Sequence, residues 1–205
     1  MNSKISKNYN LFKSRYEELA GKVYLAAKPT ESAKIVKQIL SNTNVSKGVV
    51  APIFKDIEYE LKKLFKRVKF PTITINSNDT PVAKQINEAD VGISTAEFAI
   101  AYTGTIVEVT TDDTHRLVSS LPKVHIAFLD ASQIVNSLEE AVPRLRDIYQ
   151  RHSQNCMVTF ISGPSRTADI EMKLFLGVHG PQESHVIVCD WERKSSSLRR
   201  LFSKF

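Results

Sequence analysis

Short runs of apolar, β-branched residues alternate along this chain with longer stretches in which apolar residues recur every three or four positions. Runs of the first kind predict strands, and stretches of the second kind predict helices. The expected strands are 22–26, 49–50, 68–75, 91–93, 105–109, 124–129, 156–161 and 185–189. The expected helices are 8–20, 35–40, 56–67, 95–101, 116–121 and a segment that follows the capping-box pattern of Ser137 and Glu140, where Pro143 predicts a kink or a later start.

Strands separated by helical lengths predict an α/β fold with an open, largely parallel sheet. Such sheets bind ligands at the carboxyl ends of their strands. The 205 residues fit one domain, 1–205, with an N-terminal helix within 1–20 and a basic C-terminal tail, 191–205. The tail has apolar residues at helical spacing, which is typical of a surface helix and also suits docking to a partner or a membrane surface.

The segment 161–171 predicts a site, because a strand, a Gly-Pro turn and the first turn of a helix follow one another there. Asp169 and Glu171 stand where a first helical turn favours negative charge. Hydroxyls, backbone N–H groups and a guanidinium at a helix start suit a carboxylate or phosphate. The expected ligand-binding residues of this loop are Ser162, Gly163, Pro164, Ser165, Arg166 and Thr167. In the alternative interpretation, Ser165 or Thr167 caps the helix and Arg166 forms a surface ion pair.

Composition limits the kinds of protein this chain can be. It is 42% hydrophobic and 24% charged, and no apolar run approaches the roughly 20 residues that span a bilayer. The polar start, 1–10, lacks the apolar core of a signal peptide, and the two cysteines stand far apart, so we expect a cytoplasmic protein. Two such cysteines cannot by themselves hold an iron–sulfur cluster or a structural zinc, so we expect neither a metal site nor a cofactor in this chain.

The net charge of +6 is unevenly distributed. Residues 1–90 carry a net charge of +7, residues 91–190 carry −5, and residues 191–205 carry +4. The lysines of 62–67 follow the helical pattern of a solvated face, and the motif-bearing segment is acidic. Nucleic acid is therefore not favoured, and a basic surface for an acidic partner suits the charge better.

Four ordered motifs lie between about 89 and 190. The first two comprise Glu97 and Ala101 with Thr103-Gly104-Thr105, then Arg116, Ser119, Leu121-Pro122 and His125. The other two are Ser162-Gly163-Pro164-Ser165 with Ala168-Asp169-Ile170-Glu171, and Gly177-Val178-His179-Gly180-Pro181. Together they resemble the lactate-utilisation (LUD) domain family, in particular its lactate-utilisation protein C type. The resemblance implies a fold related to CoA transferases, ribose-phosphate isomerase and formyltetrahydrofolate cyclo-ligase. One departure is Tyr102, which stands where the family usually has an acidic residue.

The resemblance also implies a role in a three-protein system that oxidises L-lactate to pyruvate, with the iron–sulfur clusters on the partner proteins. This chain would then be a subunit that binds a small carboxylate or its partner proteins. An alternative is a free-standing enzyme of the CoA-transferase or cyclo-ligase kind that acts on a small anionic substrate. A third interpretation is a scaffold whose basic ends recruit acidic partners.

Titratable residues within the motifs are the candidates for chemistry. Glu97, His179 and Glu171 are the candidate catalytic residues. Thr103, Gly104 and Thr105 are candidates to bind an oxyanion through backbone N–H groups, and His179 is also a candidate ligand. Each has a structural alternative, which is a turn at Gly104, a first-turn charge at Glu171 and a loop-closing hydrogen bond at His179. His125, within a strand, is more typical of a core histidine.

Overall fold

The computed structural model describes residues 3–75, 81–152, 156–168, 174–176 and 179–192. Its centre is a six-stranded parallel sheet with the order β1-β12-β7-β4-β2-β3. These strands are β1 (Lys22–Ala26), β2 (Gly48–Val50), β3 (Thr72–Ile73), β4 (Val91–Thr95), β7 (Val124–Asp130) and β12 (Glu183–Cys189). The predicted α/β fold with a largely parallel sheet is confirmed, although only Thr72–Ile73 of the predicted strand 68–75 pairs with the sheet.

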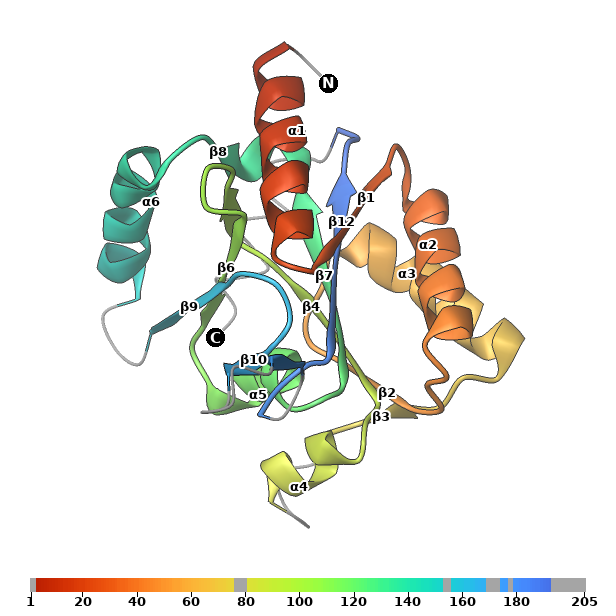
Figure 1. Cartoon of the computed structure of the whole chain (residues 1–205). Coiled ribbons are helices and arrows are strands. Elements are labelled where there is room, and N and C mark those ends of the chain that lie inside the picture. Colours follow the sequence, from red (N-terminus) through yellow and green to blue (C-terminus); the bar gives the residue numbers. More distant parts are fainter. Residues whose placement is uncertain (1–2, 76–80, 153–155, 169–173, 177–178, 193–205) are drawn as a thin grey trace.

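Helices cover both faces of this sheet (Figure 1). They are α1 (Ser3–Glu18), α2 (Pro29–Asn42), α3 (Lys55–Val68), α4 (Val82–Asn87) and α5 (Asp113–Ser120), whereas α6 (Leu138–Arg151) packs on a second sheet. On one face, α2 and α3 bury their apolar stripes against the strands, as Ile57, Leu61 and Leu64 of α3 do. On the other face, Phe12 and Tyr16 of α1 pack beside Ala127 and Val186 of the sheet.

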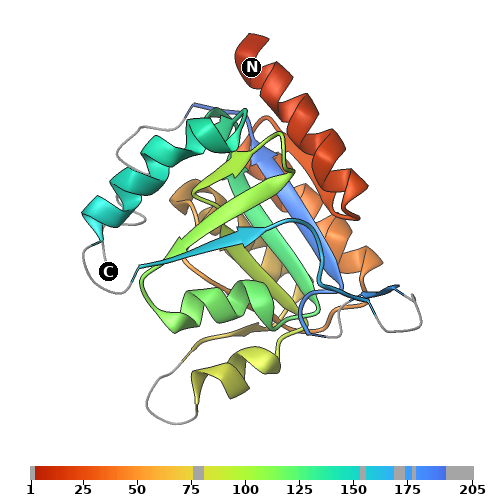
Figure 2. The ribbon, with the colours of Figure 1, turned by 60° about the vertical axis from the view of Figure 1, so that its left-hand side comes forward.

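A second, four-stranded sheet with the order β8-β5-β6-β9 lies against that other face (Figure 2). It consists of β5 (Phe98–Ile100), β6 (Thr105–Thr110), β8 (Ile134–Val135) and β9 (Met157–Ile161), and the 3-10 helix η1 (Ala131–Gln133) precedes β8. The predicted helix over 95–101 is therefore wrong. Phe98, Ala99 and Ile100 are buried in strand pairing with β6, so tertiary contacts override the helical preference of the alanines.

The helix predicted after Gly163-Pro164 is wrong for residues 166–168, and its acidic first turn, 169–171, lies outside the described residues. Residues 166–168 form strand β10 (Arg166–Ala168), which pairs antiparallel with β11 (Leu174–Leu176) in a separate two-stranded sheet. The loop 162–165 thus leads into a strand and does not lie at the positive end of a helix. Its preceding strand, β9, is antiparallel to β6 in the second sheet, so the loop does not follow a strand of the parallel sheet.

Helix α6 begins at Leu138, directly after its N-cap residue Ser137. The predicted capping box is not formed, because the Ser137 side chain makes no cap hydrogen bond and the Glu140 carboxylate accepts one from the Asn136 backbone, one residue before the N-cap, at 2.9 Å. Pro143 lies inside the helix, so the later start suggested by this proline is wrong. The predicted tail helix lies outside the described residues except for its first two positions.

A cluster of polar side chains lies at the edge of the parallel sheet, where β1 pairs with β12. The buried His185 ring accepts or donates a hydrogen bond at 3.3 Å with the Tyr24 hydroxyl, and its Nε2 lies 3.3 Å from the Glu183 carboxylate. Lys22 forms an ion pair with the same carboxylate at 2.7 Å. Burial, with the charge of Lys22, lowers the pKa of His185 to about 4.

This arrangement predicts that stability falls as the pH drops. In the unfolded chain His185 has an ordinary pKa near 6.5 and becomes protonated below that pH. In the folded chain the same ring stays neutral until the pH falls to about 4. The free energy of unfolding should therefore decrease below pH 6.5, by up to about 3 kcal/mol in total. Urea unfolding between pH 5 and 6.5, above the range in which carboxylates titrate, measures the slope. His185→Asn should flatten it; an equally steep slope in this variant would contradict the assignment.

Candidate ligand-binding pocket

A small pocket, partly open to solvent, lies where the carboxyl ends of β2 and β4 approach the end of β6. Helix α5 and the residue that follows α6 close its sides. Its lining residues are Ala51, Pro52, Ser94, Thr95, Glu108, Val109, Thr110, Thr111, His115 and His152. The pocket thus occupies the edge of the parallel sheet at which α/β folds bind ligands, as the sequence predicts, but with other residues.

Strand alternation explains why polar side chains reach the pocket. Along β6, Ile106, Glu108 and Thr110 share one face, and Ile106 packs against the parallel sheet. Glu108 and Thr110 therefore point between the two sheets, toward β4. The intervening Val107 and Val109 face the other way, into the apolar cluster beneath α6.

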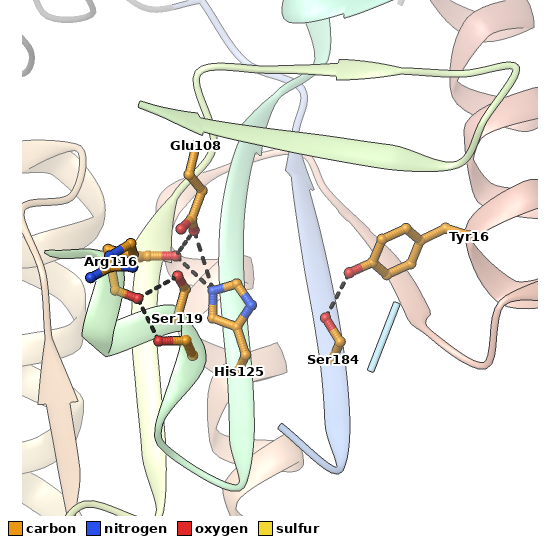
Figure 3. Close-up of polar contacts among 8 residues, drawn as sticks. Tyr16, Glu108, Arg116, Ser119, His125 and Ser184 are labelled. Carbon is orange, nitrogen blue, oxygen red and sulfur yellow. Dashed lines mark hydrogen bonds and ion pairs between the residues drawn. The ribbon is translucent and has the colours of Figure 1, made fainter. Parts of the chain in front are cut away.

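A buried polar network lies at this place (Figure 3). The Ser94 hydroxyl of β4 donates a hydrogen bond to the Glu108 carboxylate, and Ser94 Oγ lies 2.7 Å from His125 Nε2 of β7. The same His125 nitrogen is 3.4 Å from Glu108 Oε1. Each of the three residues is at most 4% exposed, so the network is shielded from bulk solvent.

The surroundings of Glu108 decide its ionisation. Burial is the largest single influence and raises the pKa of the carboxyl, but hydrogen bonding and charge from His125, with the hydroxyls of Ser94 and Ser119, outweigh it. The pKa of Glu108 therefore lies below its ordinary value. The pocket contains a carboxylate that is ionised at neutral pH.

This network differs from the triad of a serine hydrolase. In such a triad the serine and the acid contact opposite nitrogens of the histidine ring. Here Ser94 and Glu108 both contact Nε2, while Nδ1 of His125 is buried without a hydrogen-bond partner among the described residues. The arrangement holds Glu108 in place and does not activate Ser94 as a nucleophile.

Two threonine hydroxyls of the pocket lack partners within the described part of the chain. Thr95 Oγ1 and Thr110 Oγ1 are buried, each on a residue that is 7% exposed, and neither makes a hydrogen bond. A buried hydroxyl without a partner costs about 1–3 kcal/mol, so native proteins keep few of them. Two beside one pocket indicate that a ligand or solvent satisfies them.

Two histidines complete the lining. His115 lies on α5, where Asp112 caps the helix by accepting a hydrogen bond from the His115 backbone at 3.0 Å, and the ring Nδ1 lies 3.4 Å from the Asp112 carboxylate. Burial lowers the pKa of His115, against a smaller opposing effect of Asp112 and Glu108. His152 directly follows α6. The imidazole groups add hydrogen-bonding capacity at the rim of the pocket.

Most of the predicted ligand residues gather elsewhere. Thr103 Oγ1 lies 2.8 Å from Thr105 Oγ1, which lies 2.8 Å from Ser162 Oγ, so the motifs 103–105 and 162–165 do meet. Thr105 begins β6, and Glu108, the nearest pocket residue on that strand, follows three residues later, so these three hydroxyls lie about 10 Å from the pocket at about 3.4 Å per residue. No finding tests whether these residues bind a ligand, and their role stays a prediction.

The backbone conformation and close packing at 104 and 163 explain why both motifs contain glycine. Gly104 and Gly163 have φ angles of 60° and 83°, which favour glycine. Helix α1 also packs directly on them: a Cβ on Gly104 would lie 2.7 Å from the Tyr16 backbone nitrogen, and one on Gly163 would lie 2.5 Å from the Leu19 carbonyl oxygen. The motifs 103–105 and 162–165 therefore form the seat of α1, whose buried Tyr16 hydroxyl reaches Ser184 at 2.6 Å.

The remaining predicted loop residues lie near this seat. Pro164 is buried, and the backbone N–H of Ser165 donates to the Pro181 carbonyl at 2.8 Å, which joins the motifs 162–165 and 177–181. Arg166 is exposed at the start of β10, and Thr167 follows it in the same strand. His179 lies exposed before β12. Asp169 and Glu171 fall outside the described residues.

Glu97 is placed beside the pocket but outside its lining. Its half-buried carboxylate lies 3.5 Å from the Arg151 guanidinium of α6, and Oε2 has no hydrogen-bond partner among the described residues. Burial raises the pKa of Glu97, against the lowering effect of Arg151. Tyr102, the departure from the family pattern, is 65% exposed in the turn between β5 and β6.

Sequence reasoning missed Thr95, Glu108, Thr110, His115 and His152 as pocket residues, and it took His125 for a core histidine without its contacts to Ser94 and Glu108. One signal was available. Glu108 interrupts the apolar strand pattern Thr-Ile-Val-Glu-Val-Thr, and a charge inside a buried strand is rare unless it is paired. Within the described positions, no group of three or more His, Cys, Asp or Glu side chains is arranged to hold a metal ion.

Comparison with known protein families decides the family of the chain. The model of the LUD domain matches residues 9–189, which is most of the chain. The chain belongs to the LUD domain family. The match includes both sheets, the pocket and the seat of α1, so the whole described architecture, apart from the first turns of α1 and the residues after β12, is LUD domain.

Several relatives of this LUD domain protein are named lactate utilization protein C. The protein of that name from Shouchella clausii is 34% identical over 122 residues, which are 58% of this chain and 53% of the relative. The one from Exiguobacterium is 43% identical over 105 residues, which are 50% of this chain and 45% of the relative. The one from Oceanobacillus iheyensis is 28% identical over 165 residues, 78% of this chain and 70% of the relative. The chain thus matches about half the length of most of these relatives.

A solved structure shares the fold of this LUD domain. A DUF162 family protein from Deinococcus radiodurans superposes with a TM-score of 0.64 and covers 90% of this chain and 98% of its own. At 19% identity, the likeness supports the architecture alone. None of the helices among the described residues is long and apolar enough to cross a membrane.

Proposed function

We propose that this LUD domain protein is a component of a cytoplasmic lactate-utilisation system and that its pocket binds a small carboxylate. The names of the relatives support the system. The pair of unpartnered threonine hydroxyls, Thr95 Oγ1 and Thr110 Oγ1, is the observation that carries the binding function. Carboxylate oxygens accept several hydrogen bonds, and two hydroxyls with nearby imidazoles supply donors for them.

The redox step of L-lactate oxidation is assigned, in this proposal, to iron–sulfur partner proteins. The chain contains two cysteines, Cys156 and Cys189, and Cys189 is fully buried on β12. Two cysteines cannot supply the four ligands of a common iron–sulfur cluster. This LUD domain protein would hold the carboxylate while a partner carries the electrons.

The test is purification of the tagged protein from its own host under anaerobic conditions, followed by identification of what co-elutes and an assay of lactate-dependent dye reduction. We expect cysteine-rich, brown proteins in the eluate, together with dye reduction that depends on L-lactate. A matched eluate from cells that express the tag alone controls for background binding. A colourless, solitary protein without this activity would contradict the proposed role.

Glu108 favours a second candidate function, a free-standing acyl-transferring enzyme of the CoA-transferase kind. A carboxylate inside a pocket can attack an activated acyl group as a nucleophile. Turnover of acyl-CoA by the isolated protein, lost in Glu108→Gln, would support this candidate. Absence of turnover across a panel of acyl-CoA donors and carboxylate acceptors would remove it.

A further inference from the structure

A stripe of exposed lysines runs along the outward side of α3. Positions that are alternately four and three residues apart lie on one side of a helix. In α3 and its C-cap residue these positions are exposed, and they hold Lys55, Tyr59, Lys62, Lys66 and Lys69. The opposite side of the helix buries its apolar residues against the parallel sheet (Figure 1). The lysine stripe therefore faces away from the core.

The charge of the lysine stripe is only partly neutralised. Lys62 forms an ion pair with Glu58 of the same helix. Lys55, Lys66 and Lys69 form no ion pair within the described part of the chain. Opposite charges three or four residues apart stabilise a helix, and like charges at these spacings destabilise it. The stripe thus suits the binding of an external anionic surface better than it suits the stability of α3.

The basic tail, 191–205, begins beside the first turn of α3. The Trp191 indole N–H donates a hydrogen bond to the Asp56 carboxylate at 2.7 Å, and the ring packs against the apolar cluster beneath α2 and α3. A fully extended segment 193–197 spans about 17 Å, and the 14 residues of α3 span about 21 Å. The segment 198–205 is therefore within reach of the lysine stripe.

The sequence of the tail repeats the positive charge of the stripe and adds an apolar face. Residues 193–205 include five Lys or Arg and no Asp or Glu. At helical spacing, the apolar residues of this segment share one side, and most of its basic residues share the other. The apolar residues are Leu198, Leu201, Phe202 and Phe205. A basic amphipathic helix of this kind suits the boundary between lipid headgroups and acyl chains.

We propose that the lysine stripe of α3 and the tail 191–205 together dock this protein on the surface of an anionic lipid membrane. The leucine and phenylalanine side chains enter the interface, and the lysines contact the headgroups. This docking goes beyond the proposed function, because it does not depend on what the pocket binds.

Two observations favour a lipid surface over nucleic acid. A phosphate backbone attracts basic residues, but it offers no apolar layer for the leucine and phenylalanine side chains of 198–205. The charges of the stripe are also all lysines, which act as flexible point charges and suit a diffuse anionic surface. Recognition of individual phosphates by paired hydrogen bonds favours arginine.

Co-sedimentation of the full chain with lipid vesicles tests the proposal. We expect binding to vesicles of phosphatidylcholine mixed with phosphatidylglycerol, and none to phosphatidylcholine alone. Salt raised from about 0.1 M to about 0.5 M should release the protein. The triple variant Lys55→Gln, Lys66→Gln, Lys69→Gln should bind about 100-fold more weakly, since each lysine near an anionic surface contributes about fivefold, or about 1 kcal/mol.

A second triple variant is the matched control. Lys7→Gln, Lys84→Gln, Lys123→Gln removes the same charge from exposed positions outside α3 and should keep most of the binding. Leu201→Ser, Phe202→Ser should weaken binding through the apolar face of the tail, by at least about 10-fold. Circular dichroism shows whether each variant keeps the fold.

Three results would overturn the proposal. The first is a wild type that binds no anionic vesicles, or that binds neutral vesicles equally well. The second is an equal loss of binding in the two triple variants, which would show that net charge alone acts and not the lysine stripe. The third is retention on immobilised polyglutamate without binding to vesicles, which would assign this surface to an acidic protein. None of these results bears on ligand binding in the pocket.

Discussion

Replacing Gly92 with alanine should lower the free energy of unfolding by about 3 kcal/mol or more, among the largest effects of a single methyl group in this chain. Gly92 is the second residue of β4, and a Cβ there would lie 1.9 Å from the Val118 carbonyl oxygen of α5 and 3.0 Å from its carbonyl carbon. The obstacle is helix backbone, which cannot rotate away as a side chain can. Strand and helix would have to separate.

Thermal unfolding followed by circular dichroism measures this effect. A loss of 3 kcal/mol corresponds to a fall in Tm of roughly 10 °C for a domain of this size. Gly180→Ala is the matched control, because its Cβ would first meet the Ser165 side chain at 3.1 Å, and a change of a few degrees at most is expected. A Gly92→Ala protein with the Tm of the wild type would show that α5 does not pack on β4 as described.

The contact at Gly92 also matters for the pocket. Ser94 lies two residues further along the same strand. His115 lies on α5, the helix that packs closely on β4 at Gly92. Val118, which would clash with the new methyl group, is one turn from His115 on α5. Close packing of α5 on β4 thus brings the polar groups of a strand and a helix to one hollow.

The parallel sheet could be predicted because its strands are short, continuous apolar runs buried on both faces. The run 124–129 is the clearest case, since it ends one residue before β7, which is buried along its whole length, and the run 22–26 agrees with the bounds of the edge strand β1. The second sheet could not be predicted in the same way. Ala96, Ala99 and Ala101 give the segment 95–101 a helical composition, and only its burial against β6 and β8 makes it a strand.

The error at 166–168 has a similar origin. A Gly-Pro turn followed by acidic residues is a frequent helix start, but Arg166, Thr167 and Ala168 pair instead with Leu176, Phe175 and Leu174. Cross-strand pairing with a segment several residues away leaves no local signal. The predicted anion site relies on a helix that begins directly after the Gly-Pro turn, and the strand at 166–168 removes that support, although ligand binding by these residues stays a prediction.

The pocket itself could be placed only at the level of the fold. The sequence predicts a site at the carboxyl ends of parallel strands, where the pocket lies. The sequence does not show that the pocket residues meet, because Ser94, Glu108 and His125 come from three strands, 14 to 31 residues apart in the chain. The register of β4 with β7 and the stacking of β6 above them bring the side chains together.

Replacing both Thr95 and Thr110 with valine should stabilise the unliganded protein and weaken its binding of a carboxylate. Valine keeps the shape of threonine and removes the buried hydroxyl, which spares about 1 kcal/mol or more per site in the absence of ligand. The same two hydroxyls are the expected donors to the ligand. Loss of both hydrogen bonds should reduce the affinity by about 10-fold to 100-fold.

Few substitutions separate a functional role from a structural one so directly. A variant that loses binding through damage to the fold also loses stability, whereas this variant should gain it. Ser94→Ala is a useful contrast, because that hydroxyl has partners in Glu108 and His125 and its removal should destabilise the protein. Arg166→Ala separates the pocket from the loop 162–167, and it should leave the affinity unchanged if the pocket is the site.

The most direct test of the account is therefore a paired measurement on the Thr95→Val, Thr110→Val protein: its Tm without ligand and its affinity for L-lactate by calorimetry, both beside the wild type. We expect a Tm higher by a few degrees together with an affinity lower by at least about 10-fold. An unchanged affinity, or a wild type that binds no small carboxylate at all, would contradict the assignment of this pocket as the ligand site of the protein.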